Sequence, residues 1–191
     1  MSGRAPYRKR EDVTAAILGA AEDLLATRSP SEVSLREIAR RAGVQHSLIT
    51  RHFGTKDNLV AAVVQRTLAA QDEALADTES AADAFTAALE HIAAHPASYQ
   101  AVARAVIDPE RRSAGDLPTA GFEMIRERLA NDGQLPDDID VDIAAVALMA
   151  FASGWGFLED RWLATAGLGD ADRAVAREQV ALLMQRLLGP V

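Results

Sequence analysis

The stretch 34–59 constrains the fold of this 191-residue chain more than any other part, because it contains helix start and stop signals in close succession. Ser34 and Glu37 form an S-x-x-E pair, which is the pattern of a capping box, and a helix is therefore predicted to begin near Leu35. Gly43 follows the last apolar position of that helix and supplies the left-handed residue with which helices commonly end. A second helix is expected after a turn of only three residues, so the two helices should cross steeply.

The second helix, expected over about 45–53, has two different faces. At about 100° per residue, Ile49 points to one side and Ser47, Leu48 and Arg51 point away from it. An exposed Leu among small polar and cationic side chains suits a helix in the major groove of DNA, where the Leu can meet a thymine methyl group while its neighbours reach base edges. The alternative is an ordinary amphipathic helical hairpin with one exposed Leu.

These residues resemble the DNA-binding domain of the TetR family of transcriptional regulators. The family signature runs from Ile-Ala through Ala-Gly-Val to an aromatic-rich recognition helix and a next helix that begins with Lys. The matching residues of this chain are Ile38-Ala39, Ala42-Gly43-Val44, His52-Phe53, Lys56 and Leu59. The spacing Phe-x-x-Lys-x-x-Leu makes the match more specific than a bare helix-turn-helix pattern would be.

The resemblance implies an all-α fold of about nine helices, in which a three-helix DNA-binding domain precedes a helical domain for effector binding and dimerisation. The expected divisions are a flexible basic arm over 1–10, the DNA-binding domain over 11–56 with its motif at about 34–53, and the ligand-binding and dimerisation domain over 57–191. The expected DNA contacts are Gln45, His46, Ser47, Leu48, Thr50, Arg51, His52 and Lys56.

Within this set we expect His52 and Lys56 to contact phosphates and His46, Ser47, Leu48 and Arg51 to read bases. Lys56 stands in the first turn of its helix, where a cation opposes the helix dipole, and a nearby phosphate would relieve that conflict. Three positions depart from the family pattern. Gln45 replaces Ser, Ser47 replaces Gly or Pro, and Thr50 replaces a Tyr that commonly touches a phosphate. The hydroxyl of Thr50 has a shorter reach than that of Tyr.

The charge of the chain is unevenly distributed. The net charge is −8, but residues 1–56 carry ten Lys and Arg against six Asp and Glu, a net +4, and the remainder carries −12. This asymmetry favours a basic module that faces nucleic acid on an acidic body, although solvated charges scattered by chance are the alternative. The N-terminal residues have no apolar stretch of the kind found in secretory signals, so a cytoplasmic protein is expected.

The remainder of the chain is rich in Ala and predicts helices at about 80–94, 97–107, 118–131, 141–164 and 171–188, with a polar loop at 109–118. Residues 143–158 carry no charge, but sixteen residues fall short of the about 20 that span a bilayer. No membrane span is therefore predicted, and such a helix should be buried all round. In the resembled family the last two helices form a four-helix bundle with their twins, which assigns homodimerisation to 141–164 and 171–188; a purely intramolecular core is the alternative.

Aromatic side chains of the acidic part are the candidates for the walls of an effector pocket, whose existence the resemblance implies. These residues, with one neighbouring Leu, are Phe85, Leu89, Tyr99, Phe122, Phe151, Trp155 and Phe157. Each of them can equally be an ordinary core residue. The effector itself is a small molecule that the sequence does not identify.

Sequence motifs for enzymatic chemistry are not found in this chain. His91 and His95 have the spacing of two metal ligands on a helix, but no third ligand is evident nearby, and the chain has no cysteine. We therefore expect no catalytic residues, no metal and no cofactor. The resemblance implies a transcriptional regulator, in that family most often a repressor, that binds a palindromic double-stranded operator as a homodimer and is released from it by a small-molecule effector. An effector-binding helical protein with weak or non-specific DNA binding is the second reading, and an all-α metalloenzyme is a remote third.

Overall fold

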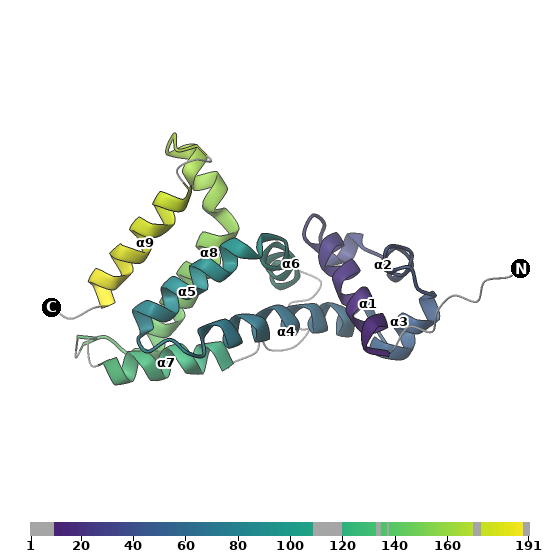
Figure 1. Cartoon of the computed structure of the whole chain (residues 1–191), viewed down its shortest axis with the longest axis horizontal. Coiled ribbons are helices and arrows are strands. Elements are labelled where there is room, and N and C mark those ends of the chain that lie inside the picture. The colour runs from purple at the N-terminus through teal and green to yellow at the C-terminus, as the bar shows by residue number, and fades with distance from the viewer. Residues whose placement is uncertain (1–9, 109–119, 133–134, 137, 170–172, 189–191) are drawn as a thin grey trace, which may run out of the picture. The chain divides into compact units, whose positions relative to one another are not determined.

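The computed structural model describes residues 10–108, 120–132, 135–136, 138–169 and 173–188. The basic arm, apart from Arg10, and the loop 109–118 lie outside these residues. All regular secondary structure in the described part of the chain is helical, which confirms the all-α fold (Figure 1). Its helices are α1 (Arg10–Leu25), η1 (Pro30–Glu32), α2 (Leu35–Ala42), α3 (His46–Phe53), α4 (Lys56–Leu75), α5 (Ala81–Ala94), α6 (Pro96–Ile107), α7 (Ala120–Asp132), α8 (Val141–Thr165) and α9 (Arg173–Leu188).

Two compact units make up the chain. The head unit comprises Met1–Arg66 and Gln100–Asp116, and the body unit comprises Thr67–Tyr99 and Leu117–Val191. Helices α4 and α6 each contribute residues to both units. The division expected at residue 56 stays a prediction.

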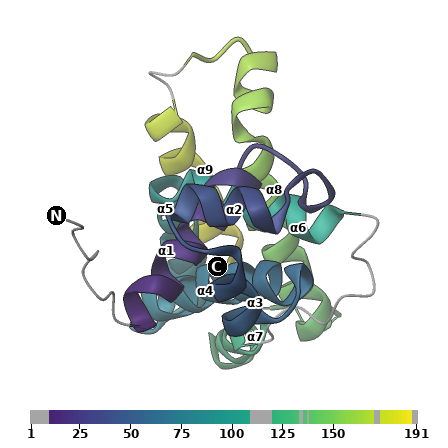
Figure 2. The same cartoon turned by 90° about the vertical axis from the view of Figure 1, so that its right-hand side faces the viewer.

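The head unit is built around apolar residues of α1, α2, α3 and the first half of α4. In this unit α1 packs on α2, and α2 packs on α3, an arrangement that can be followed in Figures 1 and 2. The side chains of Ile17, Ile38, Ile49 and Leu59, one from each helix, are almost fully buried. Each fully buried side chain of this size contributes roughly 1.5–3 kcal/mol to the free energy of unfolding, so the short helices are stabilised mainly by this packing.

The body unit is organised around α5, which contacts α7, α8 and α9. Seven of its residues are buried, and most of them are alanines, so neighbouring helices can approach closely. One close approach involves Gly156 of α8: a Cβ at this position would lie 2.4 Å from Cγ2 of Ile92 on α5. The absence of a side chain at residue 156 therefore allows α5 and α8 to pack this closely.

Helix α8 has the length and composition of a membrane span, with a mean hydropathy of 1.7 over its most apolar stretch. Only 11% of the residues of that stretch are buried in the single chain. Ile143 and Trp162 are 66% and 60% exposed, and Leu187 on α9 is 65% exposed. The expectation that this helix is buried all round is therefore not met within one chain, because α5 and α7 cover only part of its circumference.

Candidate functional site

The helix-turn-helix motif is formed by α2 and α3 of the head unit. Ser34 caps α2, since its hydroxyl oxygen accepts a hydrogen bond from the Glu37 backbone N–H at 3.2 Å. Gly43 ends this helix in the left-handed conformation, with φ of 66°. Helix α2 therefore begins and ends at the predicted residues, and α3 follows after the predicted short turn.

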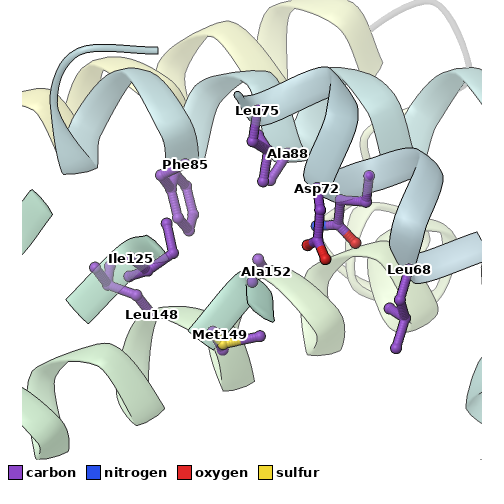
Figure 3. Close-up of a pocket in the computed structure, with 11 residues that line it drawn as sticks. Leu68, Asp72, Leu75, Phe85, Ala88, Ile125, Leu148, Met149 and Ala152 are labelled. Atoms are coloured by element: carbon purple, nitrogen blue, oxygen red, sulfur yellow. The ribbon is translucent and has the colours of Figure 1, made fainter. Parts of the chain in front are cut away.

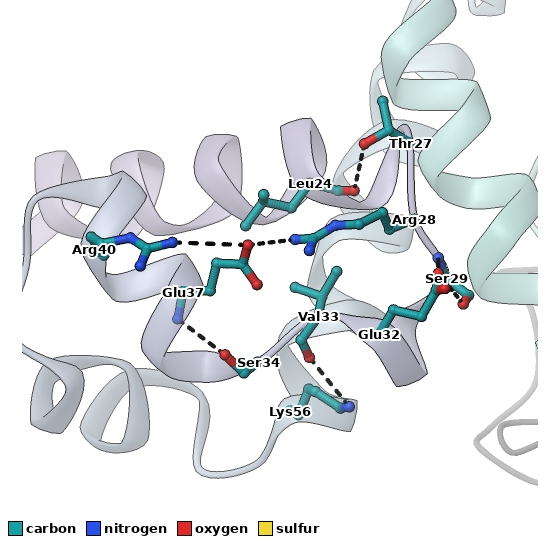
Figure 4. A network of polar contacts seen from close by, with 10 residues as sticks. All are labelled: Leu24, Thr27, Arg28, Ser29, Glu32, Val33, Ser34, Glu37, Arg40 and Lys56. Atoms are coloured by element: carbon teal, nitrogen blue, oxygen red, sulfur yellow. Dashed lines mark hydrogen bonds and ion pairs between the residues drawn. The ribbon is translucent and has the colours of Figure 1, made fainter.

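One part of the predicted capping box is wrong. The Glu37 carboxylate does not bond to the backbone N–H of Ser34 in the described structure but pairs with the Arg28 guanidinium at 2.7 Å (Figure 4). A complete reciprocal pair lies one turn earlier, where the Glu32 carboxylate accepts a hydrogen bond from the backbone N–H of Ser29 at 2.9 Å. Glu37 therefore ties α2 to the end of α1, which fixes the start of the motif on the rest of the head unit.

Helix α3 presents most of the predicted DNA contacts to solvent. Its exposed members are Gln45, His46, Ser47, Thr50 and Arg51, while Leu48 and His52 are half-buried. The structure thus places Leu48 at the edge of the exposed face rather than at its centre. Arg51 makes no ion pair within the described residues, so its guanidinium is available to an external acceptor.

His52 is held by a residue that the sequence argument did not select. Its Nδ1 lies 3.0 Å from the hydroxyl of Thr14 on α1. This contact fixes the orientation of the imidazole ring. Because Nδ1 is engaged with Thr14, Nε2 is the ring nitrogen that is left to contact a phosphate. Thr14 and His52 are 38 residues apart, so no local sequence pattern signals their contact.

Lys56 occupies the first turn of α4 as predicted, but its ammonium group already has acceptors. Its Nζ donates to the backbone carbonyl of Pro30 at 2.9 Å. It also donates to the backbone carbonyl of Val33 at 3.4 Å (Figure 4). These carbonyls relieve the unfavourable position of the cation at the helix N-terminus without a phosphate. An ammonium group has three donors, so one of them is left for a further acceptor.

The body unit contains a cavity of about 60 Å³ that is bounded by α4, α5, α7 and α8 (Figure 3). The described residues of its wall are apolar except for two residues of α4, Gln71 and Asp72. Small residues, namely Ala88, Gly121 and Ala152, leave the space open. The volume is below the about 300–1,000 Å³ of sites for drug-sized ligands, so the cavity in this form accommodates only a small molecule.

The aromatic residues predicted as pocket walls are mostly placed elsewhere. Phe85 lines the cavity. Leu89, Tyr99 and Trp155 belong to a neighbouring core cluster around Ile92, and Phe122 packs against a second cluster around Ala145. Phe151 stacks on Trp155, with ring centroids 6.1 Å apart, and Phe157 is half-buried. Asp72 was not among the predicted pocket residues, and its signal is its spacing four residues after Leu68 and three before Leu75, which puts a carboxylate on an apolar face of α4.

His91 and His95 lie close together, with ring centroids 4.3 Å apart. Nδ1 of His95 contacts the backbone carbonyl of His91 at 2.9 Å, and His95 caps the C-terminus of α5. Burial, followed by the neighbouring His95, lowers the pKa of His91. Among the described residues, no group of three or more His, Cys, Asp or Glu side chains could hold a metal ion.

Comparisons with known proteins agree with this geometry. The family model described as "Bacterial regulatory proteins, tetR family" matches residues 17–63. The HTH-type transcriptional repressor Rv3405c of Mycobacterium tuberculosis is 32% identical over 190 residues, covering 92% of this chain and 91% of that protein. The HTH-type transcriptional regulator TtgR of Pseudomonas putida is 26% identical over 181 residues, covering 84% of each.

A solved structure described as "Molecular basis for control of antibiotic production by a bacterial hormones" is 25% identical, with a TM-score of 0.68 over 94% of this chain and 98% of that chain. A tetR-family regulatory protein from Rhodococcus RHA1 shares the fold at 21% identity, with the same TM-score and coverage. A head unit with two crossed short helices and a polar outer face on the second defines a helix-turn-helix DNA-binding protein. The chain belongs to the tetR family of bacterial regulatory proteins and is a DNA-binding transcriptional regulator.

Proposed function

We propose that this protein is a cytoplasmic homodimeric repressor, that it binds a palindromic operator through α3, and that a small molecule bound in the body unit releases it. The observation that carries the proposal is the outer surface of α3, where five predicted contact residues are exposed together. Two recognition helices in a dimer must lie about 34 Å apart to enter successive major grooves. An effector that favours another spacing needs a coupling of about 1–3 kcal/mol to weaken operator binding about five- to 150-fold.

Exposed apolar side chains on α8 and α9 support the dimer. They include Ile143, Val146, Trp162, Val175, Leu183 and Leu187. A second copy would cover this surface in a symmetric interface, the commonest arrangement of soluble homo-oligomers. Glu159 of α8 is 7% exposed and pairs with Arg177 of α9 at 2.8 Å, so the apolar stretch ends in a buried ion pair well short of the helix end. This favours a protein partner over a bilayer.

Selection of bound sequences from random DNA tests the proposal. We expect an enriched palindrome at moderate salt. The absence of an enriched sequence, with binding that depends only on salt, would instead support a helical effector-binding protein without specific DNA recognition. The departures from the family pattern at Gln45, Ser47 and Thr50 motivate that second candidate.

Substitution of Arg51 tests its role within the interface. Arg51→Gln should cost about 1–3 kcal/mol of binding free energy on the selected operator and relax the preference at one base pair. Arg161→Gln is the matched control, because Arg161 is an exposed arginine of α8. Leu48→Ala should likewise relax one position, whereas Lys56→Ala should weaken all sequences alike and reduce the salt slope by about one unit.

The oligomeric state tests the other half of the proposal. Ile143→Asp should shift the protein from dimer to monomer in sedimentation velocity experiments. Ile107→Asp is the matched control, because Ile107 is 60% exposed but lies on α6. A wild-type protein that is monomeric at micromolar concentration, or that sediments with lipid vesicles, would contradict the proposed interface.

A further inference from the structure

The polar part of the cavity wall in the body unit is confined to one helix. Among the described residues that line the cavity, Asp72 and Gln71 of α4 are the ones with polar side chains, and the opposite walls come from Phe85, Leu148 and other apolar residues. The Asp72 carboxylate points into the space between Phe85, Ala88 and Ala152 (Figure 3). A ligand in this cavity would therefore meet apolar surface on most sides and a carboxylate on one side.

Within the residues that the structure describes, no cation neutralises the Asp72 carboxylate. In the described part of the chain it accepts no hydrogen bond and pairs with no cation. One of its oxygens lies against the bare Cα of Gly121, where a Cβ would come within 2.7 Å. Burial raises the pKa of the Asp72 carboxyl, which is the response of a charge that has lost part of its hydration without gaining a counter-ion.

The neighbouring Gln71 has its acceptor in use. The hydroxyl of Tyr99 donates to Oε1 of Gln71 at 2.8 Å, and Tyr99 is itself half-buried. Burial and the nearby charge of Asp72 raise the pKa of Tyr99, so this hydroxyl stays protonated and remains a donor. The Asp72 carboxylate is therefore the acceptor that the described cavity residues leave for a ligand.

Building on the proposed effector-controlled function, we propose that the effector is a small, largely apolar molecule with a single amine, and that the Asp72 carboxylate binds its ammonium group. The ammonium supplies the counter-ion that the carboxylate lacks, and charge-assisted hydrogen bonds of this kind are about twice as strong as neutral ones. The apolar remainder of the molecule lies against Phe85, Leu148 and Met149. An anionic molecule of the same shape is excluded by repulsion from Asp72.

Matched probes test this assignment on the full chain without DNA. Isothermal titration calorimetry is performed with pairs of primary amines and alcohols of equal skeleton, from benzylamine and benzyl alcohol upward to phenylbutylamine and phenylbutanol. We expect the amine to bind about tenfold or more tightly than its alcohol in every pair that binds. Phenylacetate should not bind.

Two substitutions of neighbouring acids complete the test. Asp72→Asn should abolish the preference for amine over alcohol, whereas Glu73→Gln, at an exposed position one residue further along α4, should leave it unchanged. The thermal unfolding of each variant shows that it is folded. No preference for amines in any pair, or a preference that survives Asp72→Asn, overturns the proposal.

The failure of this inference is distinguishable from failure of the proposed function. An enriched palindrome together with no amine preference refutes the assignment of Asp72 and leaves the repressor intact. An amine preference without an enriched palindrome refutes the repressor and leaves the chemistry of the cavity intact.

Discussion

The contact between Gly156 and Ile92 allows the strongest prediction of stability. Gly156→Ala would place a methyl group 2.4 Å from Cγ2 of Ile92, which is more than 1 Å inside ordinary van der Waals contact. Ile92 is buried and β-branched, so its side chain has little freedom to move away. Overpacking of this kind costs about 1–3 kcal/mol, and the better helix propensity of Ala returns about 1 kcal/mol. From the upper half of that range we expect a net loss of about 1–2 kcal/mol, or roughly 2–8 °C in Tm.

Thermal unfolding followed by circular dichroism measures this loss. Gly19→Ala is the control, because Gly19 lies inside α1 and a Cβ there would meet nothing within 4 Å, so the same substitution should raise Tm. Ile92→Ala removes the obstructing methyl group. In that background Gly156→Ala should be neutral or stabilising, with a coupling free energy of at least about 1 kcal/mol in the double-mutant cycle. Additive effects of the two substitutions would refute the steric argument.

Three further predictions concern charged groups. Arg177→Met leaves the buried Glu159 carboxylate without its guanidinium and should lower the free energy of unfolding in urea by about 3–5 kcal/mol. Lys56→Met removes two hydrogen bonds from an ammonium group to backbone carbonyls and should lower the free energy of unfolding by about 1–3 kcal/mol in the absence of DNA. Asp72→Asn should raise Tm near pH 7. Because the pKa of Asp72 is raised in the native state, the native protein binds the proton more readily than the unfolded chain. The free energy of unfolding therefore falls as the pH rises from about 4 to 7, and the advantage of Asn should shrink towards about pH 4.

Each of these predictions has an internal check. Arg161→Met, at an exposed position of α8, should change the free energy of unfolding by less than about 0.5 kcal/mol. Glu159→Gln combined with Arg177→Met should recover part of the loss, because no buried charge remains. A Lys56→Met protein as stable as the wild type would mean that the ammonium group does not stabilise the fold through the two carbonyls. If the advantage of Asn at residue 72 grew on acidification, the sign of the pKa shift of Asp72 would be contradicted.

The boundaries of the motif could be predicted from sequence because their causes are local. Ser34 caps α2 through a backbone N–H three residues later, and Gly43 ends the helix by its own conformation. The helix expected at about 97–107 occupies Pro96–Ile107, since apolar periodicity fixes the face of a helix better than its ends. These signals require no knowledge of the remainder of the chain.

Contacts between distant residues could not be predicted in the same way. Glu37 has two plausible partners in sequence, the Ser34 N–H and a cation elsewhere, and only the packing of α1 on α2 brings Arg28 within 2.7 Å. Lys56 meets carbonyls 26 and 23 residues earlier in the chain. The helix dipole alone suggests a phosphate partner for Lys56, because acceptors supplied by the fold are not visible in the local sequence.

The cavity shows a different limit of sequence reasoning. Aromatic residues were selected as pocket walls because of their size, but large side chains fill space, and Phe151 and Trp155 pack against each other. Open space forms where small residues face one another, as Ala88, Gly121 and Ala152 do. Small residues are common in every helix of the body unit, so their meeting point becomes apparent only when the helices are assembled.

One hydrogen bond of the head unit bears on how this protein could be divided or recombined. The Asp108 carboxylate, at a position 3% exposed, accepts a hydrogen bond from the backbone N–H of Ser31 at 3.3 Å, and Gln100–Asp116 clusters with the head. The module that carries α2 and α3 is therefore discontinuous in sequence. A fragment cut after Arg66 would lack Asp108 and leave the backbone of η1 without this acceptor. Transplanting the DNA specificity of this protein onto another body would accordingly require the second half of α6 to travel with the N-terminal helices.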